Sequence, residues 1–152
     1  MKKVIRENIL TAYSLHDMNI ISVDIVGNDI ILRTQSGLVE TVFPYGQPDG
    51  YVEFQNVRWD YSFVYLLGVT GNVGTFTGEK MFLKDFISRF TPFGFSVMDE
   101  TYGHNITKFN GYLSSAREHH ECIIEIYRAS RSAAFHPKAV CGHFGNPALA
   151  SR

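Results

Sequence analysis

The chain has 152 residues, of which 45% are hydrophobic and 14% aromatic, which excludes an intrinsically disordered chain and suits one domain with its own core. Fourteen Lys and Arg residues against 15 Asp and Glu residues give a net charge of −1, so no basic excess is present to neutralise nucleic-acid phosphates. Cys122 and Cys141 fit no close-spaced metal or redox motif, and no apolar run reaches membrane-spanning length. We therefore expect a cytoplasmic protein that binds neither nucleic acid nor membrane.

The N-terminal segment Lys2–Ser14 carries Ile5, Ile9 and Tyr13 at every fourth position. This spacing predicts a short amphipathic helix, although the β-branched residues are also compatible with an edge strand. We assign a helix here.

The next segment, Leu15–Thr34, reads as the first hairpin of a sheet. Two runs of β-type residues flank the turn Gly27-Asn28-Asp29, and turn residues between alternating apolar runs are the strongest short-range hairpin signal. The apolar residues that share a face on each strand are Ile21, Val23 and Ile25, and then Ile30 and Leu32.

Three further strands are predicted before the middle of the chain. Leu38–Phe43 is closed by Pro44, and the segment from Pro44 to Gly50 should be a surface loop because it combines two prolines with Asp-Gly. Tyr51–Val57 alternates, with Val52 and Phe54 on its apolar face, as in a strand with one wet face. Tyr61–Val69 is apolar on both faces, which indicates a central, covered strand.

The clearest helix is predicted at Glu79–Phe90, after the glycine-rich segment Thr70–Gly78. That segment lacks the Gly-Lys-Ser/Thr ending of a phosphate loop, so we interpret it as a flexible turn or bulge. The helix should pack on a sheet because its apolar stripe follows helical spacing. The residues of the stripe are Phe82, Leu83, Phe86, Ile87 and Phe90.

The last strands are predicted at Phe93–Met98, Ile106–Leu113 and Glu121–Arg128. Asn110-Gly111 interrupts the second of these as either a turn or a bulge. Residues 129–152 have no sustained hydrophobic period, so we expect a peripheral tail that is disordered in part or foreign to the native protein.

These elements predict a mainly β, α+β fold: an antiparallel sheet, sandwiched or strongly curved, with one packed helix. Antiparallel pairing is favoured because the connections are too short for repeated helical crossovers. Residues 1–128 should form a single domain.

His16-Asp17 is the pair whose chemistry most suggests catalysis. Imidazole nitrogen and carboxylate oxygen together suit divalent transition metals, as in phosphohydrolases. Such sites need further ligands projected from a helical bundle, whereas the surroundings here are β-type. We therefore favour a structural role, in which Asp17 accepts hydrogen bonds from nearby backbone at the strand entrance and His16 packs beside it.

Other candidate ligands are incomplete, and we expect no metal or cofactor. His119 and His120 should point to opposite faces of a strand and so cannot share a metal. His136, Cys141 and His143 are donors that zinc prefers, but a fourth is missing. No Gly-x-Ser-x-Gly elbow is present, and Cys122 fits the apolar pattern of its strand, so no catalytic residue is assigned.

Two stretches resemble small bacterial β-rich domains, some of which are immunity proteins of polymorphic toxin systems. They are the opening Tyr13–Asp17, with its following hairpin, and the late Phe109–Tyr112 with Glu121–Tyr127. The resemblance spans Tyr13 to Arg128 and implies a bacterial protein that binds another protein. It supplies no catalytic residues.

We therefore expect a non-enzymatic protein-interaction domain, immunity-like in kind, with Tyr45, Trp59, His16 and Asp17 as its binding candidates. A homodimer through an unpaired sheet edge is also compatible with the sequence. The alternative is a module that binds a carbohydrate or another small ligand by stacking, since aromatic rings offer an apolar face with a polar edge. Its candidate rings are Tyr45, Tyr51, Trp59 and Tyr102. A metal-dependent hydrolase centred on His16 and Asp17 is the least favoured hypothesis.

Overall fold

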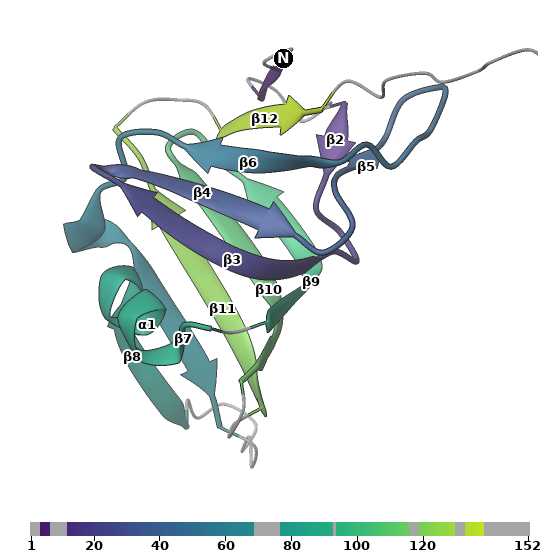
Figure 1. Cartoon of the computed structure of the whole chain (residues 1–152). Helices are drawn as coiled ribbons and strands as arrows, with labels where there is room; N and C mark the ends of the chain where they lie inside the picture. The colour runs from purple at the N-terminus through teal and green to yellow at the C-terminus, as the bar shows by residue number, and fades with distance from the viewer. Residues whose placement is uncertain are drawn as a thin grey trace, which may run out of the picture.

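The structure, a computed structural model, describes residues 4–6, 12–68, 77–92, 94–115, 119–129 and 133–138. Within these ranges the chain forms twelve strands, one α-helix and one short 3-10 helix (Figure 1). The elements are β1 (Val4–Arg6), β2 (Tyr13–Ser14), β3 (Asn19–Val26), β4 (Asp29–Thr34), β5 (Val39–Glu40), β6 (Gly50–Phe54), η1 (Trp59–Tyr61), β7 (Phe63–Leu67), β8 (Gly78–Phe82), α1 (Leu83–Phe90), β9 (Gly94–Tyr102), β10 (Ile106–Ser114), β11 (His119–Tyr127) and β12 (Ala133–Pro137).

Ten of the strands form one antiparallel sheet in the order β1-β12-β6-β4-β3-β9-β10-β11-β7-β8, while β2 and β5 form a small second sheet. The large sheet bends between β3 and β9, which pair only at Asn19 with Ser96 and at Ile20 with Phe95. The bend divides the sheet into two half-sheets whose strands cross (Figure 1). The first half-sheet consists of β1, β12, β6, β4 and β3, and the second consists of β9, β10, β11, β7 and β8. The sheet is not closed, so the predicted fold class is confirmed as a strongly curved antiparallel sheet with one helix.

The predicted first hairpin is present as β3 and β4, and Val23 and Ile25 pair with Leu32 and Ile30 on the expected face, but Ile21 does not share it. Ile30 and Leu32 are buried as expected, whereas Ile21 is 49% and Ile25 is 41% exposed. An irregularity in the pairing between Ile20 and Ser22 interrupts the alternation, so that Ile20 takes the core position in place of Ile21. Ile25 lies close to the turn and stays partly exposed, although its cross-strand partner Ile30 is buried.

The helix predicted over Glu79–Phe90 begins at Leu83, four residues later in the sequence than expected. Gly78–Phe82 is instead strand β8, which pairs antiparallel with β7, and only Leu83–Phe90 is helical. Phe82 fits the helical stripe in sequence, but its ring stacks on Phe63 across the strand pair at a centroid distance of 5.2 Å. Pairing with β7 therefore overrides local periodicity. The described residues contain no helix with the length and apolar character to cross a membrane.

The two ends of the chain also differ from the predictions. A helix over Lys2–Ser14 is wrong, because Val4–Arg6 and Tyr13–Ser14 are strands, and β-branched Val4 and Ile5 suit a strand once β12 lies beside them. The segment after Arg128 is not wholly a peripheral tail, since β12 lies between β1 and β6 in the sheet, with Phe135 1% exposed. The short run Ala133–Pro137 gave no periodic signal of its own. Residues 139–152 lie outside the described ranges.

The remaining strands follow the sequence with smaller changes. The strand predicted at Leu38–Phe43 is only Val39–Glu40 in the structure. The strand predicted at Phe93–Met98 is longer than expected, because β9 continues as far as Tyr102. A bulge does occur at Asn110-Gly111, but the extra residue is Met98 of the neighbouring strand β9, while Asn110 and Gly111 both pair regularly with β11. β7 lies between β11 and β8, as expected for a central strand. Most of the predicted turn over Thr70–Gly78 lies outside the described residues.

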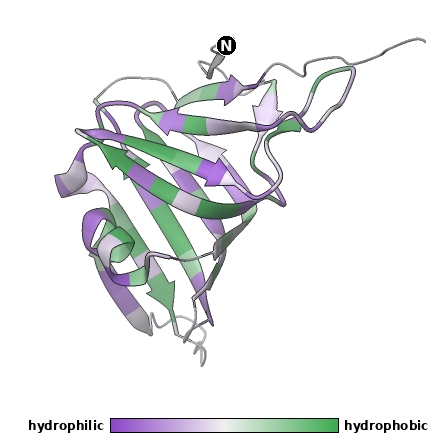
Figure 2. Cartoon of the chain, viewed as in Figure 1, coloured by the Kyte–Doolittle hydropathy of each residue, from purple (hydrophilic) through white to green (hydrophobic). Residues whose placement is uncertain are grey.

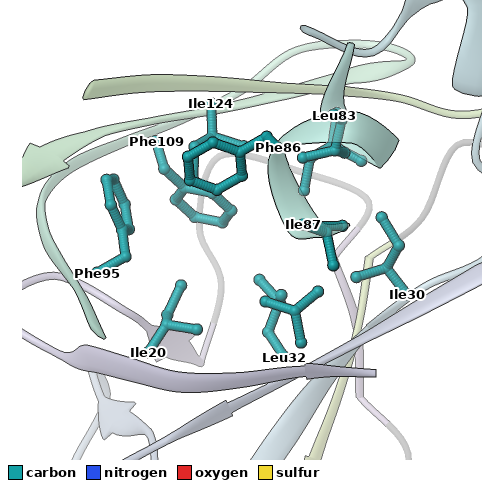
Figure 3. A pocket seen from close by; sticks show the side chains of 11 residues that line it. Ile20, Ile30, Leu32, Leu83, Phe86, Ile87, Phe95, Phe109 and Ile124 are labelled. Carbon is teal, nitrogen blue, oxygen red and sulfur yellow. The ribbon is translucent and has the colours of Figure 1, made fainter. Parts of the chain in front are cut away.

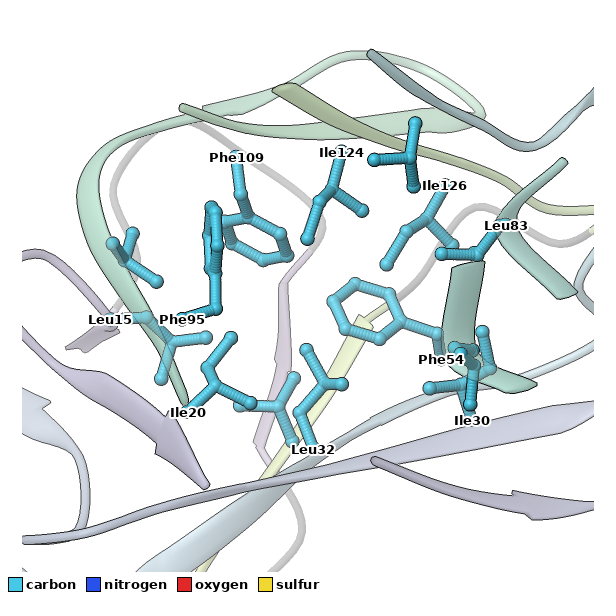
Figure 4. Packing of buried hydrophobic residues seen from close by; sticks show 14 of the residues in the cluster. Leu15, Ile20, Ile30, Leu32, Phe54, Leu83, Phe95, Phe109, Ile124 and Ile126 are labelled. Atoms are coloured by element: carbon cyan, nitrogen blue, oxygen red, sulfur yellow. The ribbon is translucent and has the colours of Figure 1, made fainter. Parts of the chain in front are cut away.

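The core fills the space between the two half-sheets, and α1 packs against the second half-sheet to cover the open side (Figures 1 and 4). Hydrophobic residues recur along the strands of both half-sheets (Figure 2). The first half-sheet contributes Ile20, Ile30, Leu32, Val52 and Phe54, the second contributes Val64, Phe95, Phe109, Ile124 and Ile126, and the helix contributes Leu83, Phe86, Ile87 and Phe90.

The described part of the core contains a cavity of about 20 Å³ lined by apolar side chains of both half-sheets and of α1 (Figure 3). A space of this size is close to that of one water molecule, and a water needs polar partners that the lining does not offer. The cavity is therefore a dry packing gap with no room for a larger ligand.

We predict that Phe86→Ala lowers the free energy of unfolding by about 3–5 kcal/mol, because it removes a fully buried ring from α1 and enlarges this gap. Urea unfolding followed by circular dichroism measures the loss. Lys84→Ala, an exposed change on the same helix, should stay within about 0.5 kcal/mol of the wild type. Equal effects of the two changes would contradict the assigned packing of α1.

Candidate functional site

Phe43 and Tyr45, the two most exposed large hydrophobic residues in the described part of the chain, lie together at the tip of the loop between β5 and β6. In this tip, residues 42–45, Val42 is 49%, Phe43 is 84% and Tyr45 is 70% exposed. The loop projects from the body of the protein beyond β5 (Figure 1). Exposing two aromatic rings at one turn forgoes favourable burial, which makes the tip the candidate contact surface.

Backbone hydrogen bonds hold the tip in a defined shape. Tyr45 N donates to Val42 O, and Glu40 N donates to Gly46 O, both at 2.9 Å. Tyr45 has a φ of 55°, a left-handed conformation that turns the chain back, and its ring meets the Phe43 ring edge-on at 6.3 Å and 89°. The two rings are therefore presented on a braced turn.

The base of the loop is closed by a second set of contacts. Leu38 N donates to Pro48 O, and Thr41 N donates to Ala12 O, each at 2.9 Å. Gly37 has a φ of +87°, and a side chain there would collide with the Pro48 carbonyl oxygen. Glycine is thus required at the base by both conformation and close approach.

Trp59, the second aromatic binding candidate, has a different role from Tyr45. It lies in η1 and packs, partly buried, against the hydrophobic core. Its neighbour Tyr61 is the exposed ring of this segment, at 55%, with the Arg58 guanidinium 5.4 Å from its centroid. The structure therefore does not join Trp59 and Tyr45 in one site.

His16 and Asp17 form a turn on the surface. His16 Nδ1 lies 3.0 Å from Asp17 Oδ2, and the two side chains are 55% and 69% exposed. Asp17 has a φ of 62°, and its backbone N–H donates to Val97 O at 2.9 Å. His16 therefore lies beside Asp17 as expected. The expected bonding of the Asp17 side chain to backbone is wrong, because the carboxylate faces the imidazole and it is the Asp17 backbone N–H that bonds to Val97.

Glu100 performs the role that the sequence assigned to Asp17. Its carboxylate accepts hydrogen bonds from Ser14 Oγ at 2.6 Å, from Leu15 N at 3.0 Å and from Tyr102 Oη at 2.8 Å. Sequence reasoning missed this group because Glu100 is 86 residues from Ser14 and meets it only through the bend of the sheet.

No group of three or more His, Cys, Asp or Glu side chains within the described ranges is arranged to hold a metal ion. His119 is exposed, with Nδ1 3.0 Å from Ser114 Oγ, and both His119 and His120 line one open hollow at the end of β11. His136 is buried, with Nε2 2.8 Å from Glu53 Oε2. Cys141 and His143 lie outside the described residues.

Two of the rings proposed to stack on a ligand, Tyr51 and Tyr102, pack against other side chains of the protein. Tyr51 stacks on His136 at 4.5 Å and 18°, with the Arg33 guanidinium 5.1 Å from its centroid. Tyr102 packs edge-on against Phe109 at 6.2 Å. Of the four candidate rings, only Tyr45 is exposed to a partner.

Two open hollows, of about 410 and 440 Å³, lie at the end of the sheet formed by β7 and β11, and both are lined by Leu67, Gly68 and His120. The first also contains Arg89 and Glu79, whose side chains pair at 2.8 Å. The charges of Arg89 and Glu79 therefore neutralise each other within this hollow.

No protein-family model, curated protein or solved structure matches this chain. The interpretation of the site therefore depends on its own geometry.

Cys122 is fully buried on β11, where desolvation raises the pKa of its thiol to about 12. The thiolate is the nucleophile in cysteine catalysis, and burial here suppresses it. Cys122 is therefore an inert core residue.

We predict that Gly37→Ala lowers the free energy of unfolding by more than Gly27→Ala. Both positions have positive φ, which costs an L-residue about 1–2 kcal/mol, but only Gly37 also meets backbone, at Pro48, while nothing lies near Gly27. Urea denaturation of both variants measures the difference. Equal losses would contradict a tightly closed loop base.

We also predict that Cys122 resists thiol reagents until the chain unfolds. In a Cys141→Ser background at pH 8, about one Cys122 thiol in ten thousand should be ionised in the folded state. Reaction with Ellman's reagent should therefore start only with denaturant. Because the folded pKa is raised from 9.0 to about 12, Cys122 should make folding less stable as the pH rises above 9, relative to Cys122→Ala.

Proposed function

We propose that the chain is a non-enzymatic protein-interaction domain that docks a partner protein through the tip, residues 42–45. The observation that carries this proposal is the exposure of Phe43 and Tyr45 on a turn held by backbone hydrogen bonds. Aromatic residues are the commonest energetic anchors of protein interfaces. A turn that is already ordered loses little entropy on binding, which leaves more of the burial energy for affinity.

The geometry favours a protein pocket over a flat sugar ring. Phe43 and Tyr45 stand at 89° to each other, so they form a wedge and not a stacking platform. Tyr51, Trp59 and Tyr102 lie against other groups of the protein and add nothing to such a platform. A carbohydrate-binding module is therefore the second candidate, and a hydrolase using the exposed His16 and Asp17 is the third.

The resemblance to immunity proteins suggests the kind of partner. An immunity protein binds its toxin in the bacterial cytoplasm, and such a toxin would be encoded beside the gene for this chain. The net charge of −1 is compatible with a protein partner and gives no electrostatic support for nucleic-acid binding.

We predict that Phe43→Ala weakens binding of the protein encoded by the neighbouring gene by about 30-fold, the effect of losing one interface anchor. Isothermal titration calorimetry measures the change. Tyr61→Ala is the matched control, because Tyr61 is an aromatic residue 55% exposed outside the tip, and it should bind like the wild type.

A benzoylphenylalanine placed at position 43 should crosslink the same partner in cells, whereas one placed at position 61 should not. Wild-type affinity of Phe43→Ala, together with no crosslink from position 43, would overturn the proposed role of the tip.

A further inference from the structure

Strand β8 ends the large sheet, with β7 as its one neighbour in the strand order. Its residues Gly78, Glu79, Lys80 and Phe82 are exposed and Met81 is half-buried. A strand at the edge of a sheet presents backbone N–H and C=O groups to which another strand can pair. β8 is therefore a second surface to examine for a partner, separate from the tip.

The charged residue that would usually protect such an edge is turned away from it. Edge lysines oppose strand addition when their ammonium groups stand out into the approach path. Lys80 instead lies over its own sheet, with Nζ 4.0 Å from the Phe63 ring centroid and 5.2 Å from that of Tyr65. Among the described residues, β7 alone pairs with β8, and the Lys80 ammonium lies on the outer face of this strand pair.

An aromatic row also reaches this edge. Phe63 and Phe82 are directly paired across β7 and β8, and their rings stack at 5.2 Å and 29°. Phe82 is 47% exposed on its other side. A residue on an added strand opposite Phe82 would extend the row, and cross-strand aromatic pairs are a main source of sheet stability.

We propose that β8 takes up an extended segment of a partner protein as an additional antiparallel strand. The partner segment carries an acidic residue opposite Lys80 and an aromatic or β-branched residue opposite Phe82. Because the pairing is antiparallel, the residue opposite Phe82 comes two positions before the acidic residue in the partner's sequence. Strand addition of this type gains affinity from the backbone and specificity from alternate side chains.

A second copy of the chain fits this edge poorly. If two β8 strands paired antiparallel about a twofold axis, the residue on the axis would lie opposite its own copy. In a register centred on Lys80, the two Lys80 side chains would therefore lie side by side. A register centred on Glu79 likewise opposes two carboxylates, and like charges directly opposite destabilise a sheet. A register centred on Met81 pairs only residues 80–82 of each chain, because α1 begins at Leu83.

The test uses a fluorescein-labelled nine-residue peptide with Phe two positions before Glu at its centre. The peptide should bind the full chain, and Lys80→Glu should weaken binding about tenfold because it turns an attraction into a repulsion. A peptide with Lys in place of Glu should recover the affinity for Lys80→Glu. Lys84→Glu, an exposed charge reversal on α1, should bind the first peptide like the wild type.

Amide shifts in NMR spectra should concentrate on residues 78–82, and Phe43→Ala should bind the peptide unchanged, so that the edge and the tip are tested separately. Absence of binding, or insensitivity to Lys80→Glu, would overturn the proposal. Concentration-dependent dimerisation that Lys80→Glu changes would replace the partner segment with a second copy.

Discussion

The short pairing between β3 and β9 is the contact on which the rest of the molecule depends. Only Asn19 with Ser96 and Ile20 with Phe95 are paired there, yet this contact joins the two half-sheets into one. Hydrogen bonds from Asp17 N to Val97 O and from Val97 N to Met18 O extend the junction at 2.9 Å each. Because the strands cross at the bend, the apolar faces of both half-sheets meet and bury each other.

The helix α1 and the last strand β12 complete the core that lies between the two half-sheets. α1 covers the inner face of β7, β8 and β11, and its buried residues fill the space that an open sheet would leave to solvent. β12 adds Phe135 to the same core from the other end of the chain. The core closes to a gap of about 20 Å³ lined by apolar side chains.

Two surface features share one property, because each exposes aromatic rings on ordered backbone. The tip exposes Phe43 and Tyr45 on a braced turn, and β8 exposes Phe82 at the end of a row of paired strands. In both, the backbone is already fixed, so a partner would meet a surface that needs little ordering.

The sequence by itself determined the β-rich class, the first hairpin and the helical stripe from Leu83 to Phe90, because alternation and helical spacing are local properties. It also identified Tyr45 as an exposed ring, since prolines and Asp-Gly place that segment in a loop. Tertiary structure decided the rest. Glu100 meets Ser14, Phe82 pairs with Phe63 and β12 joins β6 only when strands distant in sequence lie side by side, and no local pattern encodes those contacts.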